Sequence, residues 1–201
     1  FYEIVSNERI APSVYRMVLS GDTSPITAPG QFVNIKIPEL YLRRPISICD
    51  WDDKTLTLIY KTVGEGTEEL SRMKPGGRLD LLIALGNGYD TEPSGDTPLL
   101  VGGGVGIPPL FGLCKALIAE GKTVNVILGF NTAGEIFLEK EFRALGANVA
   151  VTTADGSYGL KGFVDAAMKY AEYTYFYTCG PKPMFRAVNA VAKTSGQFSF
   201  E

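Results

Sequence analysis

The 201-residue chain contains no histidine, only three cysteines and no apolar run long enough to cross a membrane. The lack of imidazole excludes serine–histidine triads, histidine metal sites and histidine general bases. Cys49, Cys114 and Cys179 are too far apart in the sequence to predict a disulfide framework or a metal cluster. The net charge of −3, with acids and bases interspersed, argues against a nucleic-acid surface. We therefore expect a cytoplasmic protein with no metal, nucleic-acid or membrane partner, whose chemistry is carried by a bound cofactor.

The first half of the sequence is a series of short runs rich in β-branched and aromatic residues, separated by turn clusters. This spacing predicts a closed antiparallel β-barrel, with one short helix at residues 67–73 plugging an end. The expected strands are residues 2–9, 14–19, 32–37, 46–50, 56–61 and 78–83.

From about residue 97 the pattern changes to alternating strands and helices. It predicts a parallel, Rossmann-like sheet that binds ligands at the carboxyl ends of its strands. A polar segment at residues 91–98 marks the boundary, so we predict a β-barrel domain over 1–94 and a nucleotide-binding α/β domain over 95–201. The expected strands are 98–101, 124–129, 148–152 and 175–178, and the expected helices are 110–120, 138–145, 163–170 and 182–193.

A glycine-rich segment at residues 99–111 (LLVGGGVGIPPLF) stands at the start of this second half. A buried strand that breaks into glycines and leads into a helix is the arrangement that binds a dinucleotide pyrophosphate. Glycine permits close approach, and the helix presents free N–H groups and the positive end of its dipole. Pro109 stands where the common fingerprint has a third glycine, and it suits a first helical turn. A plain loop-to-helix connection is the alternative.

Two segments of the first half carry candidate phosphate-binding groups. The run RRPIS at 43–47 places the guanidinium of Arg44 three residues from the hydroxyl of Ser47, although arginines entering a strand also occur at a solvated edge. In GEGT at 64–67, Gly66 and Thr67 could present N–H groups and a hydroxyl to a phosphate. The alternative for Thr67 is a helix N-cap.

In the second half, TCGP at 178–181 closes the last strand and opens the last helix. Cys179 falls where a ligand at the strand carboxyl ends would lie, and Gly180 leaves its thiol side uncrowded. A lone cysteine is more often a small core residue, and we expect Cys114 to be one.

Together these motifs, in this order and over nearly the whole chain, resemble the ferredoxin-NADP⁺ reductase superfamily. Finer details resemble one branch, the electron-transfer subunits of class 1B dihydroorotate dehydrogenases. The resemblance implies FAD on the β-barrel and NAD on the α/β domain. The motifs that carry the superfamily resemblance are Arg44-Pro-Ile-Ser47, Gly64-Glu-Gly-Thr67, Gly104-Val-Gly-Ile-Pro-Pro109 and Cys179-Gly-Pro181, and the branch adds the doubled arginine, Leu85-Gly-Asn-Gly88 and Asp155-Gly-Ser-Tyr-Gly159.

The resemblance also implies roles for individual residues. Arg44 would hold the FAD pyrophosphate, Ser47 would lie near flavin N5 and Cys179 would border the nicotinamide, which makes Ser47 and Cys179 the candidate catalytic residues. Ile46 stands where many relatives have an aromatic residue that stacks on the flavin. The expected FAD-binding residues are Arg44, Pro45, Ile46, Ser47, Ile59, Tyr60, Lys61, Gly66 and Thr67, and those for the nicotinamide nucleotide are Gly102, Gly103, Gly104, Val105, Gly106, Ile107, Pro108, Cys179, Gly180 and Pro181.

The function implied by the resemblance is electron transfer in pyrimidine biosynthesis. Electrons would pass from the FMN of a dihydroorotate dehydrogenase catalytic subunit, in a heterotetramer, through an iron–sulfur centre to FAD and on to NAD⁺. Only the family favours NAD over NADP, since residues 130–135 place neither an acid directly at the strand end nor an arginine for a 2′-phosphate.

One departure from the branch concerns the iron–sulfur centre. A C-terminal arm in this branch carries a cysteine cluster for [2Fe–2S], and this sequence contains no such cluster. We expect the chain to be truncated before the arm, because residues 198–200 are typical of a strand that leads onward. The alternatives are the small subunit of an NADH-dependent ferredoxin or sulfide oxidoreductase, and a non-catalytic flavin redox module.

Overall fold

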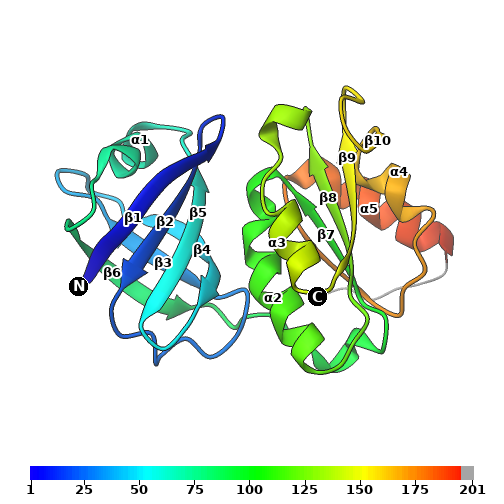
Figure 1. Cartoon of the computed structure of the whole chain (residues 1–201), viewed down its shortest axis with the longest axis horizontal. Helices are drawn as coiled ribbons and strands as arrows, with labels where there is room; N and C mark the ends of the chain where they lie inside the picture. The colour runs from blue at the N-terminus through cyan, green and yellow to red at the C-terminus, as the bar shows by residue number, and fades with distance from the viewer. Residues whose placement is uncertain (196–201) are drawn as a thin grey trace. The chain divides into compact units, whose positions relative to one another are not determined.

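Six antiparallel strands in the first half of the chain close into a β-barrel in the order β1-β2-β5-β4-β3-β6 (Figure 1). The structure is a computed structural model that describes residues 1–195. It confirms the predicted closed barrel, in which every strand pairs with a neighbour on both sides over at least part of its length. The strands are β1 (Tyr2–Ala11), β2 (Val14–Ser20), β3 (Phe32–Lys36), β4 (Arg44–Trp51), β5 (Thr55–Lys61) and β6 (Arg78–Leu85).

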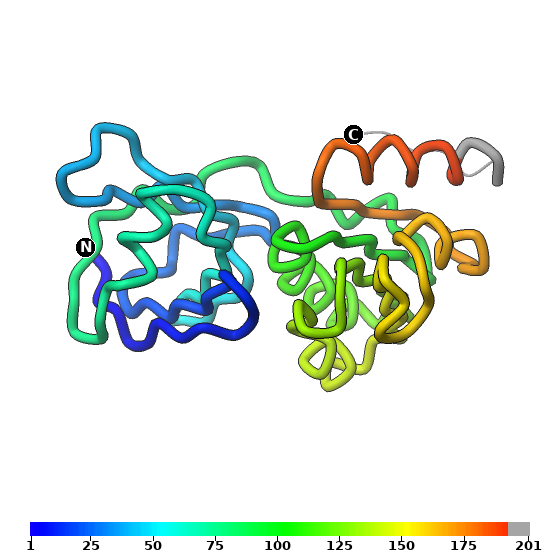
Figure 2. The backbone as a smooth tube through the Cα atoms, turned by 90° about the horizontal axis from the view of Figure 1, so that it is seen from above, coloured from blue at the N-terminus to red at the C-terminus, as the bar shows by residue number. Residues whose placement is uncertain are grey.

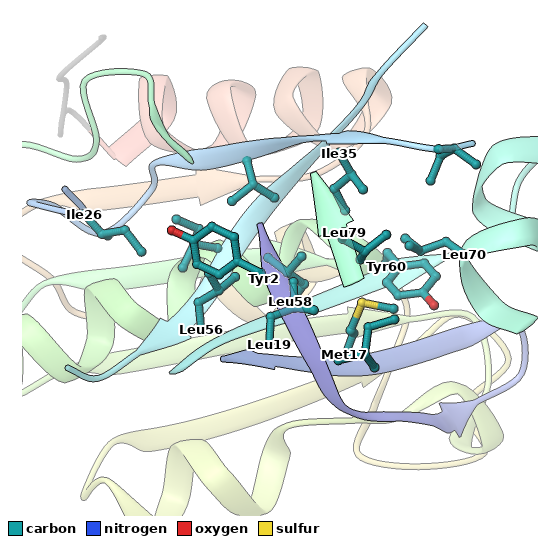
Figure 3. Packing of buried hydrophobic residues seen from close by; sticks show 14 residues of the cluster. Tyr2, Met17, Leu19, Ile26, Ile35, Leu56, Leu58, Tyr60, Leu70 and Leu79 are labelled. Carbon is teal, nitrogen blue, oxygen red and sulfur yellow. The ribbon is translucent and has the colours of Figure 1, made fainter. Parts of the chain in front are cut away.

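The barrel core follows from the two-residue period of its strands. On β5, Leu56, Leu58 and Tyr60 all point inward and are at most 2% exposed. Helix α1 (Glu65–Arg72) adds Leu70, whose side chain lies beside Tyr60 and Met17 in the same cluster (Figure 3). Burying a leucine of this size contributes about 1.5–3 kcal/mol, which holds the helix to the barrel.

A five-stranded parallel sheet, in the order β10-β9-β8-β7-β11, forms the second half. This confirms the Rossmann-like α/β fold. Helices α2 and α3 cover one face of the sheet, and α4 and α5 cover the other (Figure 1). The strands are β7 (Leu99–Gly103), β8 (Asn125–Phe130), β9 (Asn148–Thr153), β10 (Leu160–Lys161) and β11 (Phe176–Cys179); the α-helices are α2 (Pro108–Ala119), α3 (Glu139–Ala144), α4 (Val164–Met168) and α5 (Lys182–Ser195); the 3₁₀ turns are η1 (Glu92–Ser94), η2 (Gly104–Gly106) and η3 (Ala133–Glu135).

The chain divides into two compact units, Phe1–Tyr89 and Asp90–Glu201, whose backbones Figure 2 traces. Each unit has a hydrophobic cluster of its own. The polar segment after residue 90 belongs to the second unit because its backbone is tied there, for example by the Tyr177 hydroxyl, which donates to the Asp90 carbonyl at 2.8 Å.

No helix among residues 1–195 is long and apolar enough to span a bilayer. The strand expected at residues 198–200 lies outside the described residues.

Candidate functional site

Strands β4 and β5 pair over only part of their length. Their register runs from Ile48↔Leu58 to Trp51↔Leu56. Within the described chain, residues 44–47 pair only with β3, and residues 59–61 pair only with β2. The barrel therefore has an open seam, which we define as the gap between residues 44–47 and 59–61. Exposed Pro45 fits there because it has no N–H to leave unpaired.

Arg44 lies at the end of this open seam, against the start of α1. A Cβ added at Gly66 would lie 2.3 Å from Nε of Arg44, so the guanidinium occupies the space that only a glycine leaves. Its Nη1 donates to the Leu42 carbonyl at 2.5 Å, which fixes the group in place. The first N–H groups of α1 have no intrahelical acceptor, and Gly64 at the N-cap supplies no side-chain cap. A cation and free N–H groups thus converge in the geometry of an anion site.

Thr67 has a different local role from the one its motif suggested. The helix begins at Glu65, so Thr67 is its third residue and not its N-cap. The buried hydroxyl donates to the Gly64 carbonyl at 3.0 Å and accepts from the Val63 N–H at 2.9 Å. Because the hydroxyl already holds the turn, the backbone N–H is the group that Thr67 can offer to an anion.

The side chains along the open seam point in two directions. Tyr60 points into the core, where its hydroxyl donates to Oδ1 of Asn7 at 2.9 Å and burial raises its pKa. Ile46 packs against the same core. Tyr60 therefore offers only backbone to the seam, and half-buried Ile46 has no aromatic ring to stack on a flavin. Ser47 is half-buried and Lys61 is exposed. Ile59, also expected at the site, is 3% exposed.

The glycine loop after β7 packs directly on the loop after β11. Cys179 lies opposite Gly102 in the parallel register. A Cβ added at Gly106 would lie 2.2 Å from the Cys179 carbonyl oxygen, so only glycine permits this approach. Gly104 has φ of +54°, a left-handed conformation that glycine adopts without strain. Two of the predicted nucleotide-binding segments are thus brought together at one sheet edge.

The start of α2 differs from the expectation. The helix begins at Pro108, two residues earlier than predicted, and Pro108 and Pro109 both lack an N–H. The N–H of Leu110 donates to the Ile107 carbonyl, and that of Ile107 donates to Gly104. The expected free helical N–H groups are therefore absent or already bonded here. An anion at this end therefore depends on the backbone of the glycine loop that precedes the helix, assisted by the helix dipole.

Two further residues shape the corner around Cys179, and the sequence reasoning missed both. The thioether of Met184 covers the glycines, because a Cβ added at Gly103 would lie 2.7 Å from its sulfur and one at Gly180 would lie 2.5 Å from its methyl. The Oγ1 of Thr178 is buried without a hydrogen-bond partner among the described residues. Such an orphaned polar atom at a strand carboxyl end is a group that a ligand can satisfy. The sequence signal for Met184 was its position about one helical turn after Gly180, which places its side chain near that glycine.

The remaining candidates are placed as follows. Val105, which is exposed, and Ile107, which is buried, belong to the glycine loop. Pro181 immediately precedes α5. Cys114 is buried in α2, where desolvation raises its pKa to about 12, as expected of a core residue. Across residues 1–195 no group of three or more histidine, cysteine, aspartate or glutamate side chains is arranged to hold a metal.

Comparisons with known proteins agree with this geometry. Residues 100–190 match the family described as an oxidoreductase NAD-binding domain. The solved structure titled as that of the NADH-dependent reduced ferredoxin-NADP oxidoreductase is 32% identical with a TM-score of 0.86, over 96% of this chain and 72% of that one. A ferredoxin NADP⁺ reductase from Neisseria gonorrhoeae, with bound FAD and NADP, is 19% identical with a TM-score of 0.85, over 100% of this chain and 92% of that one, and shows the fold alone.

Among curated proteins, the chain is similar to electron transfer subunits of dihydroorotate dehydrogenase B (NAD(+)). The dihydroorotate dehydrogenase B (NAD(+)) electron transfer subunit of Bacillus mycoides (strain KBAB4) is 44% identical over 195 residues, which are 92% of this chain and 75% of that protein. Its counterpart in Fusobacterium nucleatum is 42% identical over 98% of this chain and 82% of that protein. The chain therefore belongs to the family of dihydroorotate dehydrogenase B (NAD(+)) electron transfer subunits.

Proposed function

We propose that this chain transfers electrons between NAD⁺ and a partner, the FMN-carrying catalytic subunit of a dihydroorotate dehydrogenase. This transfer is a step of pyrimidine biosynthesis. The chain is an FAD-dependent oxidoreductase, and its cofactors are FAD and NAD. The observation that carries the proposal is the contact of Arg44 with Gly66 beside the open seam. The names of its relatives support the partner. A heterotetramer and an iron–sulfur centre on the electron route are part of the proposal, and the cytoplasmic location stays a prediction.

The residues of the first unit fit FAD. Arg44 and the N–H groups of Gly66 and Thr67 bind its pyrophosphate, because they join a fixed cation to the start of a helix. The open seam leaves the backbone of residues 44–47 and 59–61 unpaired on one side, so it can bind the polar edge of the ring system. Half-buried Ser47 offers its hydroxyl to a flavin nitrogen.

The residues of the second unit fit a nicotinamide nucleotide. The N–H groups of residues 103–106 face the pyrophosphate, and the close packing of Gly106 on the Cys179 carbonyl fixes the loop. Thr178 gives the ligand a buried hydroxyl that has no partner among the described residues. Cys179, half-buried at the end of β11, borders the nicotinamide.

Because the chain has no histidine, the cofactor and the protein have separate tasks in the reaction. Bound FAD supplies the redox chemistry, because it exchanges a hydride with NADH and exchanges single electrons with a metal cluster. The protein holds and orients the rings, as hydride transfer requires near-contact distance. Ser47 and Cys179 act by position, the first beside the flavin and the second beside the nicotinamide.

The test is an anaerobic NADH titration of the FAD-loaded protein, followed by its visible spectrum. Bleaching of the flavin bands is expected. If FAD does not bind, the assignment of Arg44, Gly66 and Thr67 is wrong. If FAD binds but NADH does not bleach it, the assignment of the glycine loop and Cys179 is wrong.

The second candidate is a subunit of an NADH-dependent ferredoxin oxidoreductase, favoured by the similarity to the solved structure with that activity in its title. The two candidates differ in the partner. Affinity purification of the tagged chain from its native cells distinguishes them, because the first predicts co-purification of a dihydroorotate dehydrogenase catalytic subunit. Co-purification of a ferredoxin-linked subunit instead would favour the second.

A further inference from the structure

Ser47, the residue proposed to meet the flavin, is held in place by one neighbouring strand. The open seam leaves residues 44–47 without a partner on the β5 side, so within the described chain they pair only with β3. In that ladder Ser47 lies opposite Phe32, the first residue of β3. The position of Ser47 therefore depends on the position of Phe32.

The side chain of Gln31, which immediately precedes β3, joins two loops at this end of the barrel. It is 6% exposed. Its Oε1 accepts from the N–H groups of Thr27 and Ala28 at 2.9 and 3.2 Å. Its Nε2 donates to the carbonyls of Ala84 and Gly86 at 3.3 and 3.1 Å. We call these hydrogen bonds the Gln31 bridge, and they give the buried amide a partner at both of its polar atoms.

The segment of β6 that the Gln31 bridge holds is a strained β-bulge. The register of β3 with β6 shifts between Phe32 and Asn34, which leaves one extra residue on β6 over this stretch. Ala84 lies within the bulge and has φ of +55°, a left-handed conformation that alanine rarely adopts. Surrounding contacts must hold such a residue in place, and bulges and strained residues are both frequent beside functional sites.

Gln31 holds both sides of the strand end that carries Phe32. On the β4 side its backbone carbonyl accepts from the Ile48 N–H at 3.0 Å, next to Ser47. On the β6 side its amide bonds the residues before and after Leu85, which lies opposite Phe32. Ser47, Phe32 and Leu85 thus lie in one row across three strands. Movement of the bulge would therefore move Phe32 and, with it, Ser47.

From this geometry we infer that Gln31 is a positioning residue for flavin reduction. The Gln31 bridge keeps β6 and β3 in place, and β3 in turn keeps the Ser47 hydroxyl at its distance from the flavin. Gln31 binds no ligand itself, because its side chain is buried and its amide is fully engaged. A displacement of about 1 Å at a reacting centre can slow a reaction about 100-fold, so such a residue can still set the rate. The inference rests on the proposed function and adds the residue that places Ser47.

The experiment compares wild type, Gln31→Met and Thr23→Val as full-length, FAD-loaded protein. Methionine is similar to glutamine in length but forms none of the hydrogen bonds of the Gln31 bridge. Thr23→Val is the matched control, because Thr23 is also buried in the barrel and its hydroxyl donates to the carbonyl of Asp52, in the turn between β4 and β5. Stopped-flow absorbance gives the rate constant of flavin reduction at saturating NADH and the NADH concentration for half-saturation.

Gln31→Met is expected to lower the saturating rate constant roughly 10- to 100-fold. The NADH concentration for half-saturation and the FAD dissociation constant should stay close to the wild-type values, since the groups that bind the two pyrophosphates are unchanged. Thr23→Val should lower stability and leave the rate constant as it is. An unchanged rate constant in Gln31→Met, or an equal fall in Thr23→Val, would overturn the inference.

A double-mutant cycle with Ser47→Ala separates positioning from general damage to the barrel. If Gln31 acts through Ser47, Gln31→Met should change the rate constant little once the Ser47 hydroxyl has been removed. An equal fall with and without that hydroxyl would show that Gln31 only supports the fold, and the inference would be wrong.

Gln31→Asn replaces Gln31→Met if the methionine variant does not fold. It keeps the amide but is one methylene shorter, so it cannot reach both loops, and the same fall in rate constant is expected. Failure of both variants to fold would mean that the Gln31 bridge serves the fold alone, against the inference. A wild type that binds FAD but is not bleached by NADH would instead overturn the proposed function.

Discussion

Two adjacent arginines where β4 begins have different partners and therefore different roles. Arg43 forms a two-point ion pair with Asp80 of β6, at 3.0 and 3.1 Å, and donates to the Asn34 carbonyl. Its hydrogen bonds lower the pKa of Asp80. Arg44 contacts no carboxylate among the described residues and lies against Gly66. Arg43 thus connects strands of the barrel, whereas Arg44 has charge to offer to a ligand.

Replacing Arg44 should therefore weaken FAD binding more than it weakens the fold. Arg44→Ala removes charge-assisted hydrogen bonds to the pyrophosphate and is expected to lower FAD affinity roughly 10- to 100-fold. The quenching of flavin fluorescence on binding gives the dissociation constant, and urea unfolding of the apoprotein gives the stability.

Arg43→Ala is the matched control for this prediction. It breaks the ion pair with Asp80, so it should lower the free energy of unfolding and change FAD affinity far less than Arg44→Ala does. Equal losses of FAD affinity in both variants would mean that Arg44 acts through the barrel and not through the phosphate.

At the residue scale, the sequence predicted which segments matter better than it predicted what each side chain does. The register brings 44–47 and 59–61 to the two sides of one seam, although their assignment to FAD stays a proposal. The inward direction of Tyr60 was readable from the period of two with Leu56 and Leu58. The role of Thr67 was not, since a hydroxyl near a helix start can cap, bridge or bind an anion.

At the element scale, the strands were predictable because their β-branched runs are bounded by turn residues. The first residues of the helices were less predictable. The N-cap of α1 is Gly64, which has no side chain to cap the helix, so nothing in the sequence marked its beginning at Glu65. The two-residue β10 was missed because two residues have no period, and only its pairing with β9 defines it. The sequence predicted that Pro109 suits a first helical turn. Together with Pro108, however, it also removes backbone N–H donors from the start of α2.

The contact between the glycine loop and the end of β11 gives a prediction about both elements. Gly106→Ala places a methyl group 2.2 Å from the Cys179 carbonyl oxygen, so the two loops must separate. We expect the NADH concentration for half-maximal flavin reduction to rise at least about tenfold, because the nucleotide depends on both loops. FAD content should be unchanged, since FAD lies on the other unit.

Gly121→Ala is the control for a strained glycine in the same unit. Gly121 follows the other end of α2 at φ of +82°, and a Cβ there meets nothing within 4 Å. This variant should lose about 1 kcal/mol of stability from the left-handed conformation while its NADH dependence stays normal. If Gly121→Ala raises the NADH requirement as much as Gly106→Ala does, the effect comes from general loosening of the unit.

At the scale of the whole molecule, the two cofactors are assigned to two units with separate cores. The barrel cluster draws only on residues before Tyr89, and the second cluster only on residues after Asp90. The segment after residue 90 is fastened to the second unit by the Tyr177 hydroxyl and by Thr91, which donates to Glu120 at 2.9 Å. Residues of its own unit therefore bury each core, and neither core depends on the other unit for its burial.

This separation predicts that residues 1–89 fold alone and keep the flavin site. Apart from the open seam, every strand of the barrel pairs on both sides, and the barrel core includes Leu70 of α1. The fragment should unfold cooperatively in urea and bind FAD with the same Arg44 dependence as the full chain, but NADH should not bleach its flavin, because the glycine loop and Cys179 are missing. Bleaching of the fragment by NADH would place the nicotinamide site on the barrel. A fragment that is unfolded with FAD present would show that the barrel depends on the second unit, and the division at Tyr89 would then describe the shape of the chain without describing how it folds.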